Sequence, residues 1–135
     1  MAYEALDFYD IDSLLTDEER MIRDVVRDWV EERILPNIEE ACREGVFPDE
    51  WRAEIGEMGI LGAPLKGYGC PGLSYTAYGL ICQELERGDS GVRSFASVQG
   101  SLVMYPIWDF GSEEQKEQYL PKMASGELVG GFGLT

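Results

Sequence analysis

The sequence from Gln83 to Ile107 reads QELERGDSGVRSFASVQGSLVMYPI and predicts the end of one helix, a tight break and a second helix. The break is GDSG at 88–91, where two glycines allow positive φ angles and the Asp or Ser side chain can cap a helix. One face of the second helix then collects residues at helical spacing. They are Arg93, Ser97, Gly100, Ser101 and Met104. This face is an arginine followed by mostly small side chains.

The arginine-headed face allows two interpretations. The planar fork of an arginine suits a carboxylate or a phosphate, so the first is a ligand groove with an anion anchor. The second is a surface arginine above a helix that packs closely on a neighbour through its small residues. Spacing alone favours the second interpretation. The opposite face is expected to lie in the core and carries Val92, Phe95, Ala96 and Val103.

Five further helices are expected around this stretch, so the predicted fold class is all-α. The first runs from about Asp17 to Ile34, begins at a capping box formed by residues 16–19, and ends near Pro36. Its apolar stripe predicts the residues that face the core. They are Ile22, Val25, Val26, Trp29 and Val30.

Two shorter helices are expected next. The first ends near Gly45, and the second begins at Pro48 and ends at Gly59, which suits a left-handed C-cap with Ile60 folded back onto the helix. Their inward residues are expected to be Ile38, Ala41 and Cys42 in the first, and Trp51, Ile55 and Met58 in the second.

The remaining helices follow a glycine- and proline-rich loop at 62–72. Ser74 is expected to cap a helix whose inward face is Tyr78, Ile81, Cys82 and Leu85. Pro106 and Gly111 are expected to end the helix after the break. The last helix begins at the sequence SEEQ, residues 112–115, and turns Tyr119 and Leu120 inward.

The two ends of the chain differ from this helical middle. Residues 1–15 are acidic and aromatic without a clear period, which predicts an N-terminal arm along the surface. Residues 127–135 are glycine-rich and β-prone, which predicts one extended strand. A lone strand has no partner in a helical chain, so we expect it to start a β-domain that continues beyond Thr135. The helical domain between these ends is residues 16–126.

Charge and composition argue against several function classes. The net charge of −15, from 26 acidic and 11 basic side chains, disfavours binding to nucleic acid or to an anionic membrane. No run is long enough to span a bilayer, and the first residues do not form a secretory signal. Cys42, Cys70 and Cys82 predict free thiols in a reducing cytoplasm. The sequence has no histidine, the commonest general base and metal ligand, so no metal site is expected.

Five segments together resemble the N-terminal part of the acyl-CoA dehydrogenase family. They are LTDEERMIRDVVRDWVEERILP, EMGILGAPLKGYGCPGLS, ELERGDSGVRS, GSEEQKEQYLPKMASGE and GGFGLT. Each is weak alone, but the set in this order is specific, and the resemblance covers residues 14–135. The resemblance is greatest to the glutaryl-CoA dehydrogenases, because relatives that act on plain fatty acyl chains do not share Arg93, the second arginine of the third segment.

The resemblance implies a fold and a reaction. The fold has an N-terminal all-α domain of about six helices, a middle β-domain whose first strand is present here, and a C-terminal helical bundle. The reaction is FAD-dependent α,β-dehydrogenation of glutaryl-CoA, commonly followed by decarboxylation to crotonyl-CoA, in lysine and tryptophan degradation. Electrons would pass to an electron-transfer flavoprotein, and the enzyme would be a homotetramer.

The resemblance also implies roles for individual residues. Arg93 matches the residue that pairs with the distal carboxylate of the glutaryl group, and Ser94 matches a substrate contact beside it. Glu86 and Ser97 match groups that orient the arginine. The start of the flavin-binding segment is matched by Phe132, Gly133, Leu134 and Thr135. The family's catalytic base is a glutamate of the C-terminal bundle, so we expect this chain alone to be inactive and to bind FAD weakly or not at all.

Two function classes stay open on the sequence. One is the acyl-CoA dehydrogenase domain described above. The other is a free-standing helical module that binds acyl-CoA or a protein partner without catalysis. Arg93 can also be a solvated helix charge, Glu86 a surface charge at a helix end, and Ser97 an aid to close packing. A gene that continues past Thr135 into Glu-Pro, or a flavin spectrum of the purified protein, would separate the two classes.

Overall fold

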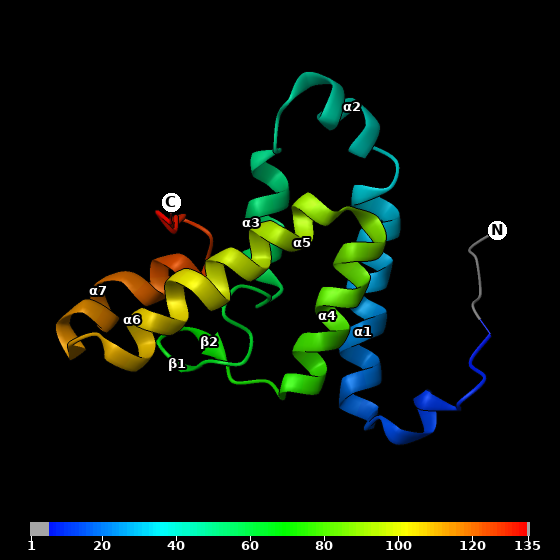
Figure 1. Cartoon of the computed structure of the whole chain (residues 1–135), viewed down its shortest axis with the longest axis horizontal. Helices are drawn as coiled ribbons and strands as arrows, with labels where there is room; N and C mark the ends of the chain where they lie inside the picture. Colours follow the sequence, from blue (N-terminus) through cyan, green and yellow to red (C-terminus); the bar gives the residue numbers. More distant parts are fainter. Residues whose placement is uncertain (1–5, 135) are drawn as a thin grey trace.

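The structure is a computed structural model that describes residues 6–134, and its helices account for most of the fold (Figure 1). The α-helices are α1 (Asp17–Trp29), α2 (Ile38–Glu44), α3 (Asp49–Glu57), α4 (Tyr75–Gly88), α5 (Ser90–Ser97), α6 (Tyr105–Phe110) and α7 (Glu113–Ala124). Two π-helical segments, η2 (Val30–Ile34) and η3 (Val98–Met104), extend α1 and join α5 to α6. The described residues therefore form six continuous helical bodies, which confirms the predicted all-α domain.

Helices α1 and α4 lie side by side and run in the same direction (Figure 1). Ser74 donates to Glu19 at one end, and Gly88 packs against Val30 at the other, where an added Cβ would lie 2.7 Å from the valine Cγ1. The helix formed by α5, η3 and α6 then crosses the molecule to reach α7. The buried core gathers side chains from these helices and from the loop after α3. Its largest fully buried apolar members are Ile34, Ile55, Ile60, Leu61, Ile81, Leu85, Met104 and Leu120.

Helix starts lie where their capping residues predict. The Thr16 hydroxyl accepts from the Glu19 N–H at 3.2 Å, and the Thr16 N–H donates to the Glu19 carboxylate at 3.0 Å, which completes the capping box. Ser112 and Gln115 form the same arrangement before α7. Ser74 caps α4 by accepting from the Ala77 N–H. These side chains satisfy backbone donors that no helical carbonyl can reach, so they fix where each helix begins.

The end of α3 is also as predicted. Gly59 adopts a left-handed φ of 70°, and its N–H donates to the Gly56 carbonyl at 3.0 Å. The next N–H, of Ile60, donates to the Ile55 carbonyl at 3.2 Å, which completes a Schellman motif. The Ile60 side chain is buried, so the helix end is closed by an apolar contact as well as by hydrogen bonds.

The helix after the GDSG break differs from expectation in its middle. In η3 the backbone bonds follow the wider i→i+5 pattern, so residues seven and eleven positions after Arg93 no longer share its face. Gly100 and Met104 are buried, whereas Ser101 is exposed. Pro106 was expected to end the helix, but it does not. It lies in the first turn of α6, where a missing N–H is tolerated, and the helix continues to Phe110.

The loop at 62–72 contains a feature that the sequence did not indicate. Strands β1 (Lys66–Gly67) and β2 (Cys70–Pro71) pair antiparallel, and the turn between them, Tyr68–Gly69, has φ angles of 54° and 85°. Two positive φ angles indicate a type I′ turn, which usually contains Asn-Gly, so Tyr-Gly gave no signal. The indole N–H of Trp108 donates to the Lys66 carbonyl and the Tyr68 hydroxyl to Glu113, which holds this hairpin on α6 and α7.

Three residues expected to face inward do not. Val25 is 53% exposed, because only the side of α1 that carries Ile22 and Val26 packs against the core. Cys42 is exposed on the short helix α2, and Tyr119 is 36% exposed on α7. Among the described residues, no helix combines the length and the apolar composition that crossing a bilayer requires.

The described parts of the two ends lie on the surface. Residues 6–15 include a short 3-10 helix, η1 (Ile11–Leu14), and are tied to α1 because Asp12 pairs with Arg23 and its carbonyl accepts from Arg20. After α7 and Gly126, residues 127–134 do not pair with either described strand. The domain boundaries predicted at these ends stay predictions.

Candidate functional site

Arg93 lies in the first turn of α5, directly after the break that ends α4. The Asp89 carboxylate accepts from the Val92 N–H at 3.0 Å and so fixes the start of α5. The Arg93 Nε donates to the Glu86 carboxylate at 2.6 Å, and Nη1 donates to the Ser97 hydroxyl at 3.2 Å. Arg93 therefore bridges the last turn of α4 and the second turn of α5, with a side chain 35% exposed.

The charges of this pair are stabilised by their hydrogen bonds. Donation by Arg93 and by the Ser90 hydroxyl lowers the pKa of Glu86 below its ordinary value, and the Glu86 hydrogen bond raises the pKa of Arg93. Both groups are ionised at neutral pH. The Nη2 donors of Arg93 make no hydrogen bond to any of residues 6–134, so this edge of the guanidinium is available to an anion.

Two side chains of α4 near Arg93 were missed by the sequence reasoning as part of a site. The Tyr78 hydroxyl lies 3.2 Å from the Ser101 hydroxyl, and burial raises the pKa of the Tyr78 phenol and of the Cys82 thiol. The Arg93 charge acts on both groups in the opposite direction. Tyr78, Cys82 and Glu86 are spaced by four residues on α4, and this spacing was the signal that could have placed them beside Arg93.

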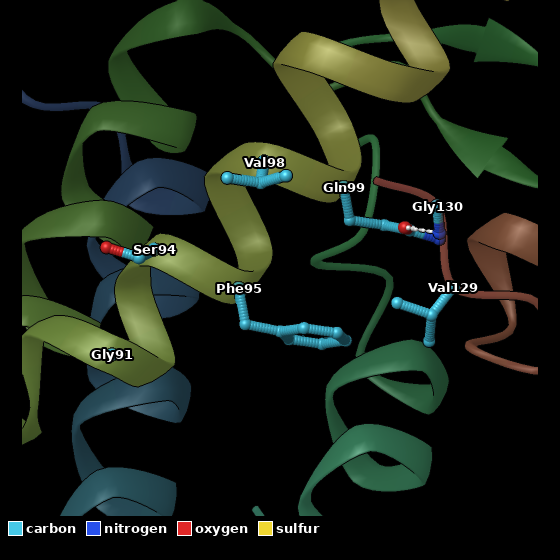
Figure 2. Close-up of a pocket in the computed structure, with 7 residues that line it drawn as sticks. All are labelled: Gly91, Ser94, Phe95, Val98, Gln99, Val129 and Gly130. Carbon is cyan, nitrogen blue, oxygen red and sulfur yellow. Dashed lines mark hydrogen bonds between the residues drawn. The ribbon is translucent and has the colours of Figure 1, made fainter. Parts of the chain in front are cut away.

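Ser94 does not join the Arg93 cluster through its hydroxyl. It lines a cavity of about 290 Å³ between the α5–η3 helix and the C-terminal segment. Figure 2 shows Phe95 and Val98 on the helix side of this cavity and Val129 and Gly130 across from them. The structure thus brings Glu86, Arg93 and Ser97 into direct contact and places Ser94 at the neighbouring cavity. Whether these residues bind a substrate stays a prediction.

The residues predicted to meet a flavin lie at the exposed end of the chain. Phe132 is 55% exposed, Leu134 is 80% exposed, and Gly133 is exposed between them. The Leu134 N–H donates to the Phe132 carbonyl at 3.0 Å, which is a local turn rather than a strand pairing. Thr135 lies outside the described residues. The flavin assignment for this segment stays a prediction.

The C-terminal segment is joined to the helices by Gln99, a residue that sequence reasoning did not single out. Gln99 is 1% exposed, and its Nε2 donates to the carbonyls of Leu128 at 2.7 Å and Met123 at 3.2 Å. Its Oε1 accepts from the Gly130 N–H at 2.9 Å, the bond drawn in Figure 2. The cavity beside Ser94 is closed on one side by this contact.

The remaining titratable groups do not suggest a metal site or a reactive thiol. No group of three or more possible metal ligands comes together in the part of the chain that the structure describes. Burial raises the pKa of the Cys70 thiol to about 11, so this thiol stays protonated at neutral pH.

Comparison with known proteins places these features in a family context. The family described as "Acyl-CoA dehydrogenase, N-terminal domain" matches residues 16–127. A probable acyl-CoA dehydrogenase of Bacillus subtilis is 37% identical over 124 residues, which cover 90% of this chain and 32% of the relative. The chain spans about a third of the length of the relatives it matches.

Solved structures give the same result. A glutaryl-CoA dehydrogenase of Mycobacterium smegmatis in complex with FADH2 superposes with a TM-score of 0.88 at 48% identity, over 92% of this chain and 32% of that one. A second structure described as glutaryl-CoA dehydrogenase from Mycobacterium smegmatis has a TM-score of 0.84 at 57% identity, over 88% and 31%. At these identities the likeness extends beyond the shared fold to the amino-acid sequence as a whole.

Proposed function

This chain belongs to the acyl-CoA dehydrogenase family, and from this premise we propose that it forms the acyl-group pocket of an FAD-dependent glutaryl-CoA dehydrogenase. The observation that carries the proposal is Arg93, which is held by Glu86 and Ser97 with one guanidinium edge still free of hydrogen bonds to residues 6–134. The similarity to solved glutaryl-CoA dehydrogenases supports it.

The substrate class follows from the chemistry of Arg93. A glutaryl group ends in a carboxylate, whereas a simple fatty acyl group of similar length ends in a methyl. Removing a carboxylate from water without a cationic partner is costly, so a selective pocket has to place a cation at the distal end. Arg93 is the only basic residue between Arg87 and Lys116. In this proposal Glu86 and Ser97 orient it toward the carboxylate, and Ser94 contacts the acyl group.

The C-terminal segment fits an edge of a flavin site. When bound there, FAD would supply the acceptor for the hydride removed from the acyl group. Phe132 and Leu134 are exposed apolar side chains that a flat ring could cover, and a Cβ added at Gly131 or Gly133 would meet no atom within 4 Å. A backbone with this much space around it can offer its N–H and carbonyl groups to a ring. We assign Phe132, Gly133, Leu134 and Thr135 to this edge.

The rest of the reaction is proposed from family membership. We place the catalytic base outside these 135 residues and residues 127–135 at the start of a β-domain, with residues 16–126 as the helical domain. The whole enzyme would carry out α,β-dehydrogenation with decarboxylation to crotonyl-CoA, as a homotetramer that reduces an electron-transfer flavoprotein. Within this scheme the described residues bind and orient the acyl end and keep water from it.

The proposal is tested by substituting Arg93→Met in the flavoenzyme that contains this domain. Loss of the cation should lower kcat/KM for glutaryl-CoA by roughly a hundredfold or more, the scale expected when one partner of a charge pair is removed. The value for butyryl-CoA should change far less, because a methyl terminus needs no cation. Arg43→Met is the matched control, since Arg43 is an exposed arginine on α2 whose ion pair within residues 6–134 is with Glu39. An equal loss on both substrates would make Arg93 a structural residue and remove the main support for glutaryl-CoA.

A further inference from the structure

Gln99 is a buried polar residue that the proposed reaction does not use. It projects from η3, and among residues 6–134 Glu84 on α4 is the one other buried polar side chain. A buried carboxamide is costly unless its donors and acceptor are satisfied. Gln99 makes three hydrogen bonds, and all three go to the backbone at or beyond the end of α7. The side chain is therefore committed to holding the chain after α7.

The bonds to Leu128 and Gly130 have the pattern of a strand pairing. In an extended chain the carbonyl of one residue and the N–H two residues later point to the same edge, and a parallel neighbour bonds both through one residue. The Gln99 amide donates to the Leu128 carbonyl and accepts from the Gly130 N–H in this way. A side chain thus takes the place of a neighbouring strand beside Val129. This pairing sets the direction in which the chain leaves Gly130.

Close packing reinforces the same position. A Cβ added at Gly130 would lie 2.3 Å from the Cγ1 of Val103, the residue four positions after Gln99 on η3. Only a glycine lets the backbone approach the helix closely enough for the Gln99 bonds to form. Gln99 and Val103 therefore define the place of Gly130 from two sides, one polar and one apolar.

We propose that Gln99 is a positioning residue for the flavin-facing segment. Phe132 begins only two residues after Gly130, and a slip of one residue in an extended chain exchanges the side chains on its two faces. Gln99 fixes the register at Gly130 and so determines which groups of residues 132–135 face the ring. This inference rests on the proposed function, because the flavin assignment of the segment comes from it.

The anchoring itself is tested without flavin by hydrogen exchange on the 135-residue chain. Gln99→Met keeps the volume and removes the three hydrogen bonds, so exchange of the Gly130 N–H should rise about tenfold or more, the scale of one lost hydrogen bond. Amides within α1 and α4 should keep their rates. Gln83→Met, on the exposed side of α4, should change neither set. Unchanged exchange at Gly130, or an equal rise across all helices, would overturn the proposal.

A second pair of variants guards against a Gln99→Met chain that does not fold. Gly130→Ala should accelerate exchange over residues 128–134, because the new Cβ pushes the segment off Val103. Adding Val103→Ala removes the two methyl groups nearest to that Cβ and should restore part of the protection. A double variant no better protected than Gly130→Ala would show that the contact does not hold the segment, and would count against the proposal.

The link to the cofactor is tested in the flavoenzyme. Gln99→Met should raise the rate of FAD dissociation about tenfold, by the same lost contact, and shift the visible flavin spectrum, whereas Gln83→Met should do neither. Lost anchoring with unchanged FAD dissociation and spectrum would refute the positioning role. A wild-type enzyme that holds no FAD would refute the proposed function, and with it the flavin part of this inference, while the exchange measurements would still decide the anchoring.

Discussion

Glu84 and Glu86 stand two residues apart on α4 and both pair with arginine, but their surroundings differ. Glu84 is 1% exposed and accepts from Arg27 at 2.7 Å and from Arg87 at 2.9 Å, so it ties α4 to α1. Glu86 is 47% exposed and accepts from Arg93. The Nη2 donors of Arg93 make no hydrogen bond to residues 6–134. The first cluster is closed by the fold, and the second is open to a ligand. Burial and leftover donors, rather than the presence of an ion pair, distinguish a structural glutamate–arginine pair from a candidate binding pair.

The difference is tested most strongly by removing a partner from the closed cluster. Arg27→Met leaves Glu84 buried with one arginine, which should lower the free energy of unfolding by about 3–5 kcal/mol. Urea unfolding followed by circular dichroism measures it. Arg43→Met should cost far less, because Arg43 is 70% exposed and its ion pair among the described residues lies within α2. A similar small loss in both variants would show that Glu84 is solvated and that the two clusters on α4 do not differ in kind.

A titration separates the same clusters at an intermediate scale. Burial opposes ionisation of Glu84, but hydrogen bonds from Arg27 and Arg87 outweigh it, so the pKa of Glu84 is lowered below 4.5. The ionised carboxylate therefore contributes its full stabilisation above about pH 4.5. This stabilisation is lost as the pH falls through the lower pKa that Glu84 has in the folded state.

The variant Glu84→Gln removes this titration. It should be less stable than wild type by about 1–3 kcal/mol at neutral pH, and the gap should narrow as the solution is acidified below the pKa of the folded protein. Urea midpoints measured across the pH range give both quantities. Glu39→Gln, an exposed glutamate of α2, is the matched control and should follow the wild-type profile. A gap that is constant with pH would mean that Glu84 is not ionised in the folded state.

The smallest effect on stability is expected from the open cluster. Glu86→Gln should leave the urea midpoint unchanged, because exposed ion pairs contribute little to folding. In the flavoenzyme the same change should lower kcat/KM for glutaryl-CoA by about tenfold, the scale of one charge-assisted hydrogen bond, since Arg93 loses the group that orients it. Butyryl-CoA turnover should be nearly unaffected. A large loss of stability would instead make Glu86 a second structural glutamate.

Local signals in the sequence were sufficient for much of the helical framework. Thr16, Ser74 and Ser112 each supply the oxygen that a nearby backbone N–H needs, and Gly59 supplies the left-handed angle that ends α3. These interactions join residues a few positions apart, so the sequence contains both partners side by side. The Arg93–Glu86 contact also joins residues near in sequence, across one break between consecutive helices, but it was expected from the family resemblance rather than from a local signal.

The parts that could not be predicted depend on distant partners. Gln99 bonds to residues 24 to 31 positions away, and nothing in its own neighbourhood indicates a strand-like partner. Gly100 and Met104 were expected on the face that Arg93 heads, but the wider turns of η3 place both in the core. A Cβ added at Gly100 would lie 3.2 Å from the Gly62 backbone nitrogen, which agrees with the interpretation of close packing through small residues. Glu84 was predictable in part. Its spacing from Ala77 and Ile81 places it on the buried face of α4, where a carboxylate requires a partner, but the spacing does not identify Arg27 as that partner.

The π-helical segment η3 also acts as a phase shift between two halves of one helix. A π-helical turn holds more residues than an α-helical turn. The residues after η3 therefore point in other directions around the helix axis than an unbroken α-helix would give them. Deleting one residue within 98–104 would turn everything beyond it by about 100° relative to Arg93. Val92 and Ala96 would stay in the core while Ile107 and Trp108 rotated away from it. For this domain, sequence length between the break and α6 is therefore a stricter requirement than the identity of most residues within it.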